Sequence, residues 1–297
     1  MKIILSLVLL FSFHSKAFFK KPEDSKTEKT TVEKSIRKLK KHAEKGNLQS
    51  QYELGMRYYK GDGIVKDLQE AVFWLQKSGN KGYIDSQKQL YSMYSKGDGV
   101  SRNTSLGIHW LEKAAHQGDF EAQYELSKIY LNKDPKKALQ WLLKASKKGH
   151  VKSQNKLGFM YFNGVDGVRK DLEKAIYWFE RAGKKGDFYA QFNASLIYRD
   201  YRGDRPDLKD IKKAIYWLRK AAMQNYAPAQ YELALIYYNS DGEDSNYVLA
   251  YSWLTIALLN GYQQASKIQS NISAQMTHLE IQEAKKLAFK IHKEINQ

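Results

Sequence analysis

The chain has 297 residues, enough for two ordinary domains or one long repeat array, and a formal net charge of +17. It contains no cysteine, which excludes disulfide frameworks, thiolate zinc sites and cysteine nucleophiles. Only four prolines occur, so long helices are permitted. The basic excess suits an acidic partner, an anionic membrane or nucleic acid, and equally a lysine-rich solvated surface.

The N-terminus has the pattern of a secretory signal peptide over residues 1–17. Lys2 supplies the positive charge, and residues 3–13 form an apolar stretch too short for a stable membrane anchor. Small residues stand at the two positions that a signal peptidase reads, Ser15 and Ala17, so we expect cleavage after Ala17. An uncleaved amphipathic N-terminus is the alternative. We therefore expect an exported protein, periplasmic or secreted, without an integral membrane segment after cleavage.

The segment 18–34 is polar and mixed in charge, and it is predicted to be a flexible linker. From Ser35 onward the sequence repeats itself. All the tryptophans fall on one ladder, with spacings of 36, 31, 37, 39 and 36 residues. A second ladder consists of small residues, each followed by Gln, with a tyrosine eight residues after the small residue in every copy. The signature positions are Trp74, Trp110, Trp141, Trp178, Trp217 and Trp253, and Tyr58, Tyr94, Tyr130, Tyr161, Tyr198 and Tyr237.

Each copy predicts two helices. In helix A the small residue, Leu and Tyr at i, i+4 and i+8 share one face, and in helix B small residues flank the Trp at i, i+3 and i+7. Favoured N-cap residues open each helix B, and residues that accept a left-handed conformation close it. The predicted N-caps are Asp67, Asn103, Asp134, Asp171, Asp210 and Asn246, and the predicted ends are Gly82, Gly118, Gly149, Gly186, Asn225 and Gly261.

Length varies only in the loop from helix A to helix B. The turn from helix B to the next helix A has a constant length, because the small residue before Trp lies 15 residues before the small residue of the next helix A in every copy. The loop from helix A to helix B varies, because the signature Tyr lies 8 to 16 residues before the small residue of helix B. A packed turn cannot change length, whereas a solvated loop can. We predict capping elements at both ends, where Thr277 and Glu280 form a capping-box pattern.

The repeat resembles the Sel1-like repeat, the longer relative of the tetratricopeptide repeat. Residues 55–63 (GMRYYKGDG) with 71–75 (AVFWL) carry the resemblance, and so do 157–161 (LGFMY) with 175–178 (AIYW). It implies an all-α, right-handed α-solenoid in which helix A lines the concave side. The expected organisation is a signal peptide (1–17), a linker (18–34), an N-terminal capping helix (35–49), six repeats (50–85, 86–121, 122–152, 153–189, 190–228, 229–262), and a half-repeat with a capping helix (263–297).

No constellation indicates catalysis, a cofactor or a metal. The Gly-Asp-Gly loops recur where a helix must end, so they are interpreted as turns and not as phosphate loops. His109 and His116 lie seven residues apart in one helix B, but no third ligand is visible for a metal site. Nucleic acid is disfavoured, because the repeat pattern accounts for many of the aromatic residues.

The resemblance implies a protein-binding scaffold outside the cytoplasm, in envelope regulation, envelope complex assembly or host-cell contact. Two alternatives stay open: a cell-envelope hydrolase, and a cationic adaptor for cell wall or lipid. The partner is expected to be another protein, with acidic character suggested by the charge. The candidate binding residues are helix A positions outside the signature, Tyr52, Glu53, Arg57, Tyr124, Glu125, Tyr231 and Glu232, and a second candidate is the loop 201–209.

Overall fold

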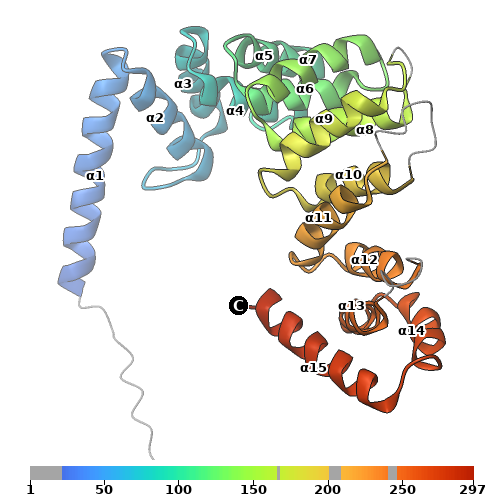
Figure 1. The fold of residues 1–297 in the computed structure, drawn as a ribbon. Helices are drawn as coiled ribbons and strands as arrows, with labels where there is room; N and C mark the ends of the chain where they lie inside the picture. Colours follow the sequence, from blue (N-terminus) through green and yellow to red (C-terminus); the bar gives the residue numbers. More distant parts are fainter. Residues whose placement is uncertain (1–21, 166–167, 201–208, 240–245) are drawn as a thin grey trace, which may run out of the picture. The chain divides into compact units, whose positions relative to one another are not determined.

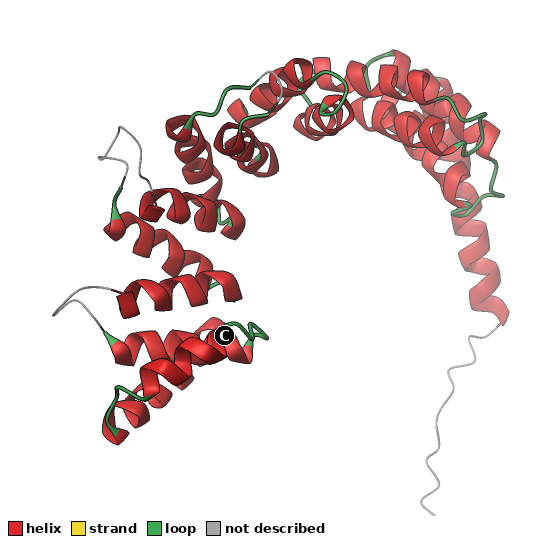
Figure 2. Ribbon diagram, turned by 90° about the vertical axis from the view of Figure 1, so that its right-hand side faces the viewer, coloured by secondary structure: helices red, strands yellow, loops and turns green. Residues whose placement is uncertain are grey.

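A computed structural model describes residues 22–165, 168–200, 209–239 and 246–297 (Figure 1). The predicted signal peptide lies outside the described residues. In the described ranges the fold is all-helical, and an isolated antiparallel bridge joins Val165 and Val168 (Figure 2). The helices are α1 (Pro22–Glu44), α2 (Leu48–Lys60), α3 (Leu68–Asn80), α4 (Ile84–Lys96), α5 (Thr104–His116), α6 (Phe120–Tyr130), α7 (Pro135–Lys147), α8 (Val151–Asn163), α9 (Leu172–Gly183), α10 (Phe188–Asp200), α11 (Ile211–Ala222), α12 (Ala227–Asn239), α13 (Tyr247–Leu259), α14 (Ala265–Ser273) and α15 (His278–Ile295).

The helices pack in tandem pairs, as a solenoid of two-helix repeats requires. The chain divides into two compact units, Met1–Gly107 and Ile108–Gln297. In the first unit α2 packs on α3, and in the second α6 packs on α7, α8 on α9, α10 on α11 and α12 on α13. The second helix of a pair also packs on the first helix of the next, as α7 does on α8 and α9 on α10. Each pair is one predicted repeat, with helix A first and helix B second.

The predicted N-cap residue begins helix B in every repeat. Its side-chain oxygen accepts a hydrogen bond from an N–H group in the first turn, which is otherwise left without a partner. Asp67 accepts two such bonds and the other five N-caps one each, at donor–acceptor distances between 2.8 and 3.0 Å. In the first turn of α3, the Glu70 side chain accepts a hydrogen bond from Trp74 Nε1 at 3.0 Å.

The turn from helix B to the next helix A has one geometry throughout. The predicted closing residue has a positive φ in each copy, between 64° and 96°. The next residue donates its N–H to the carbonyl of the small residue four positions after Trp, as Asp187 does to Ala182 at 3.2 Å. The Gln that opens helix A is buried, and its Nε2 donates to a carbonyl eight residues earlier, as Gln191 does to Gly183 at 2.8 Å. These repeated bonds explain why this turn keeps a constant length.

The loop from helix A to helix B is fixed only at its ends. In all six repeats the backbone N–H of the helix B N-cap donates to the carbonyl of the signature Tyr, at 2.7 to 3.0 Å. This bond spans only four residues from Tyr130 to Asp134 and twelve from Tyr198 to Asp210. The different loop lengths therefore do not alter how the two ends are joined.

The signature aromatics form the interior. The six tryptophans are 2 to 7% exposed, and small residues on neighbouring turns leave room for their rings. Two signature tyrosines, Tyr94 and Tyr198, are also buried, and the other four are half-buried. Tyr198 donates its hydroxyl to Glu180 Oε1 of the preceding repeat at 2.9 Å, and burial with this bond raises the pKa of Tyr198. The repeats are therefore joined by apolar packing and by hydrogen bonds from tyrosine.

The ends of the chain differ in one respect from expectation. Helix α1 begins at Pro22, so the prediction of a flexible linker is wrong for residues 22–34. This segment has no proline after Pro22 and no glycine, so nothing interrupts the backbone hydrogen bonds of a helix. At the other end, Thr277 and Glu280 form the predicted capping box of α15. None of the described helices is both long enough and apolar enough to cross a membrane.

Candidate protein-binding surface

The predicted binding tyrosines all lie on helix A, and each contacts the aromatic residue that precedes the next helix A. Tyr52 contacts Tyr83 with ring centroids 5.3 Å apart in the first unit. In the second unit Tyr124 contacts His150 at 5.2 Å, and Tyr231 contacts Tyr262 at 5.1 Å. Burial is the main cause that raises the pKa of Tyr52 and of Tyr231. These tyrosines therefore join neighbouring repeats, and their rings are only half available to a partner.

The predicted charged residues are ion-paired within the chain. Arg57 lies 3.5 Å from Glu53 and 3.6 Å from Asp62, so its charge is shared between two carboxylates. Glu125 pairs with Lys128 at 2.6 Å. Glu232 of α12 pairs with Arg199 of α10. The structure does not gather these residues into one site.

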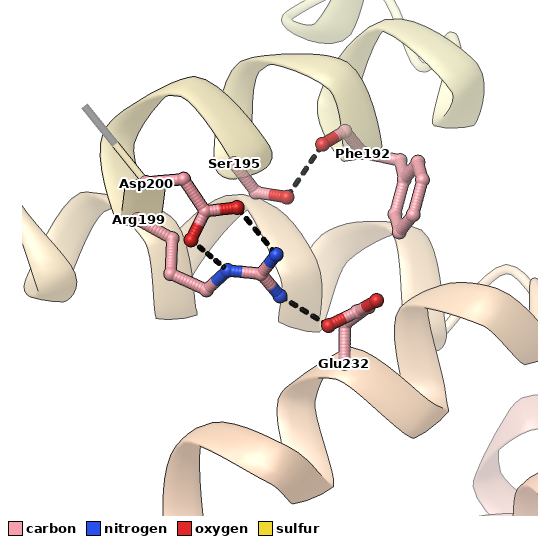
Figure 3. A network of polar contacts seen from close by, with 5 residues as sticks. All are labelled: Phe192, Ser195, Arg199, Asp200 and Glu232. Carbon is pink, nitrogen blue, oxygen red and sulfur yellow. Dashed lines mark hydrogen bonds and ion pairs between the residues drawn. The ribbon is translucent and has the colours of Figure 1, made fainter. Parts of the chain in front are cut away.

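Arg199 connects two repeats and borders a cavity of about 610 Å³. Its guanidinium donates from Nε to Asp200 at 2.7 Å and from Nη1 to Glu232, so both carboxylates bind the same cation (Figure 3). Asp200 and Glu232 hold the pKa of Arg199 above its ordinary value, with the hydrogen bond to Asp200 as the largest cause. The arrangement is a satisfied ion-pair network that fixes α10 against α12.

A larger groove lies on the helix A side of the second unit. It has a volume of about 790 Å³ and is lined by α6, α8 and α10 and by the turn before α10. Phe159 and Tyr189 are 47% and 53% exposed there, so both rings are accessible to a partner. The lining residues with polar or charged groups are Tyr124, Lys152, Asn155, Lys156, Asp187, Tyr189, Asn193 and Gln224.

The groove has a positive character. Its one carboxylate, Asp187, accepts from Ala190 N at 2.7 Å and from Asn155 Nδ2 at 3.0 Å, so it serves as a helix cap. Lys152 and Lys156 form no ion pair with a described residue, and Lys156 Nζ lies 5.5 Å from the centre of the Phe159 ring. Two unpaired cations beside exposed rings can bind a segment that carries carboxylates and apolar side chains.

Sequence reasoning missed Lys152, Lys156, Phe159 and Tyr189. The signal was present, because Lys156 has the same place in its repeat as Glu53, Glu125 and Glu232. Alignment of the fourth repeat with the others would therefore have identified Lys156 as a candidate. The repeat pattern could not show that Tyr189, in the first turn of α10, borders the same groove.

His150 forms a buried cluster at the edge of this groove. Its Nδ1 lies 2.8 Å from Ser153 Oγ, and its Nε2 lies 3.3 Å from Glu121 Oε1. This is the residue set of a hydrolase triad, but Ser153 is 0% exposed, so no substrate can reach its hydroxyl. The His150 ring lies 5.2 Å from both Phe120 and Tyr124. The cluster therefore serves to join α6 to the start of α8.

This cluster should make stability depend on pH. Burial lowers the pKa of His150, although Glu121 opposes the effect. Above about pH 6.5 the ring is neutral in both the folded and unfolded states; as pH falls below that value, the unfolded state binds the proton first and stability declines. Other repeats have tyrosine at the position of His150, as Tyr83 and Tyr226 show. The variant His150→Tyr should therefore lose less stability at low pH than the wild type. Urea unfolding at pH 7.5 and 5.5 measures the difference; an equal loss in both proteins would contradict the assignment.

The other candidates receive no support as sites. Among the described residues, no group of three or more His, Cys, Asp or Glu side chains could hold a metal ion. His109 contacts Trp110 and His116 contacts Trp141, with centroids 6.3 and 5.1 Å apart. Residues 201–208 of the second candidate, the loop 201–209, lie outside the described residues. Its last residue, Lys209, lines the Arg199 cavity.

The tandem helix pairs define a class of protein, the helical-repeat solenoid. The Sel1 repeat family matches six segments that cover more than half of the chain, at residues 48–83, 92–119, 120–150, 151–187, 189–226 and 227–262. The chain therefore belongs to the Sel1 repeat family. This fold is generally a scaffold for protein–protein interaction, and proteins built from it are typically non-catalytic.

The chain is also similar to solved structures. A Sel1 repeat protein from Oxalobacter formigenes is 30% identical, with a TM-score of 0.53 over 72% of this chain and 88% of that one. A protective antigen of uropathogenic Escherichia coli with the same type of repeat is 26% identical, with a TM-score of 0.36 over 88% and 72%. A putative Sel1 repeat protein from Klebsiella pneumoniae is 21% identical, with a TM-score of 0.37 over 68% and 99%. No curated protein matches the chain.

Proposed function

We propose that the chain is a non-catalytic scaffold that holds an acidic segment of another protein in the groove of α6, α8 and α10. The observation that carries this proposal is the combination of two unpaired lysines with half-exposed Phe159 and Tyr189. A partner that covers these rings removes apolar surface from water, and its carboxylates compensate the lysine charges. Helix A residues are held by buried bonds on their other face, so the groove is preformed before a partner binds.

Photo-crosslinking tests which surface meets the partner. Phe159 is replaced by p-benzoylphenylalanine, and Tyr177 of α9, which is similarly exposed at 51%, carries the same probe in a control variant. After irradiation in cells, we expect Phe159 to give a discrete crosslinked protein band that Tyr177 does not give. Identical bands from both positions, or no band from Phe159, would contradict the groove as the binding site.

Charge reversal in the groove should then weaken binding of the crosslinked partner. Lys152→Glu with Lys156→Glu places two carboxylates where the partner's carboxylates are expected, so the dissociation constant should rise by at least about tenfold. Titration calorimetry with the purified partner measures it. Lys212→Glu with Lys220→Glu on α11 makes the same change of charge at residues that do not line the groove, and it should leave affinity nearly unchanged. If both pairs weaken binding equally, only net charge matters and the groove assignment fails.

We propose that this scaffold acts outside the cytoplasm. Lys2, the apolar residues 3–13 and the small residues before position 18 support export through a cleaved signal peptide. The roles open to such a scaffold are envelope regulation, assembly of an envelope complex and contact with a host cell. We expect the chain recovered from the envelope or medium to begin at Phe18, which N-terminal sequencing checks. Retention of Met1 in a cytoplasmic fraction would contradict export.

A further inference from the structure

The basic charge of the second unit is concentrated on one set of helices. The B helices α7, α9, α11 and α13 carry ten Lys or Arg and two Asp or Glu residues. The A helices α6, α8, α10 and α12 carry four of each. The basic excess of these helices lies on α7 and α11, which carry four Lys or Arg each and no Asp or Glu, whereas α9 carries two of each sign.

Half-exposed tyrosines stand on two of these B helices. Tyr177 of α9 and Tyr216 of α11 occupy the same repeat position, directly before Trp, and each is 51% exposed. Each ring lies edge-on against the buried Trp that follows it, with centroids 4.9 Å apart, so the Trp holds the Tyr in place. The tyrosines are therefore fixed aromatic projections and not mobile surface side chains.

A cation accompanies each of these rings. Arg181 Nη1 donates to the Tyr177 hydroxyl at 3.0 Å, and Lys220 Nζ lies 5.1 Å from the centre of the Tyr216 ring. The first unit contains the same device by itself on α3, where Phe73 is 46% exposed and Lys77 Nζ lies 4.5 Å from its ring. An aromatic ring with a cation one turn later thus recurs at one position of helix B in three repeats.

We propose that the helix B face of α9 and α11 binds the surface of an anionic lipid bilayer. Tyrosine has an apolar body and a polar tip, which suits the headgroup region of a membrane, and long basic side chains beside it reach the phosphates. Tyr177 and Tyr216 line neither the 790 Å³ groove nor the Arg199 cavity. Aromatic rings that each stand beside a cation, outside both of these hollows, match the headgroup layer of a bilayer better than a protein whose anchor residues need a pocket.

Vesicle sedimentation tests the proposal on the full chain. The vesicles are pure phosphatidylcholine, or phosphatidylcholine with 30% phosphatidylglycerol, so binding to the neutral vesicles gives the background from the apolar N-terminus. We expect the wild type to bind the anionic vesicles and to be released as salt rises. Lys212→Glu with Lys220→Glu should lower the partition coefficient by at least about tenfold. Tyr177→Ser with Tyr216→Ser should weaken binding and leave the helical circular dichroism unchanged.

The groove variant provides the matched control. Lys152→Glu with Lys156→Glu changes net charge by the same amount, but it should leave vesicle binding within about twofold of the wild type. An equal loss in both charge variants would show a response to net charge alone and would overturn the proposal. Binding to heparin or single-stranded DNA without binding to anionic vesicles would also overturn it, because the face would then serve a soluble polyanion.

Discussion

Replacing Trp217 by alanine is expected to lower the free energy of unfolding by about 3–5 kcal/mol. The Trp217 ring is 2% exposed, and it packs over Gly183 of the preceding repeat, where an added Cβ would come within 3.1 Å of the ring. Its removal leaves a cavity between two repeats, and such a cavity cannot close without moving the helices on both sides. Urea unfolding followed by circular dichroism measures the loss.

The adjacent residue provides the control for this prediction. Tyr216→Ala removes a ring of similar size that is 51% exposed, and it should change the free energy of unfolding by less than about 1 kcal/mol. The contrast between two neighbours tests the assignment of the Trp ladder to the interior. Similar losses for both variants would mean that the Trp217 ring is not a main contact between repeats.

Gly158→Ala is expected to destabilise the fourth repeat by about 1–3 kcal/mol, although alanine favours helices over glycine by about 1 kcal/mol. An added Cβ at Gly158 would lie 2.6 Å from Cδ1 of Phe179, whose ring is 0% exposed. Phe179 occupies the position that holds Leu218 in the next repeat, where Ser195 faces it in place of glycine. The missing side chain of Gly158 thus provides room for the larger ring of Phe179.

A double-mutant cycle checks this relation. In a Phe179→Leu background the ring is absent, so Gly158→Ala should become neutral or stabilising when unfolding is measured in urea. A loss that persists unchanged in that background would mean that the glycine is required for another reason, such as the path of the α8 backbone.

The repeat register could be predicted because its signals are local. The Asp or Asn N-caps, the left-handed closing residues and the buried Trp depend on side chains within one or two helical turns, and all six copies agree. The linker prediction failed because residues 22–34 have low apolar content, and helix formation there depends on the absence of breakers and not on a buried face.

The binding surface was only partly predictable. The sequence correctly assigned Tyr52, Tyr124 and Tyr231 to helix A, but it gave no indication that each stacks on the next repeat. Likewise it showed Glu232 as a free acid, whereas Arg199, which lies 33 residues earlier, neutralises it. Such pairings depend on how far one repeat is rotated relative to its neighbour, which no single-repeat pattern records.

The sequence by itself determined the number of helix pairs, their caps, the aromatic interior and the family, since each follows from spacing along the chain. Only the tertiary structure decided which surface residues meet: that Lys152, Lys156, Phe159 and Tyr189 line one groove, and that Tyr177 and Tyr216 are half-exposed on α9 and α11. The physical reason is that hydrophobic periodicity fixes what is buried within a repeat, whereas contacts across the surface depend on the packing angle between repeats.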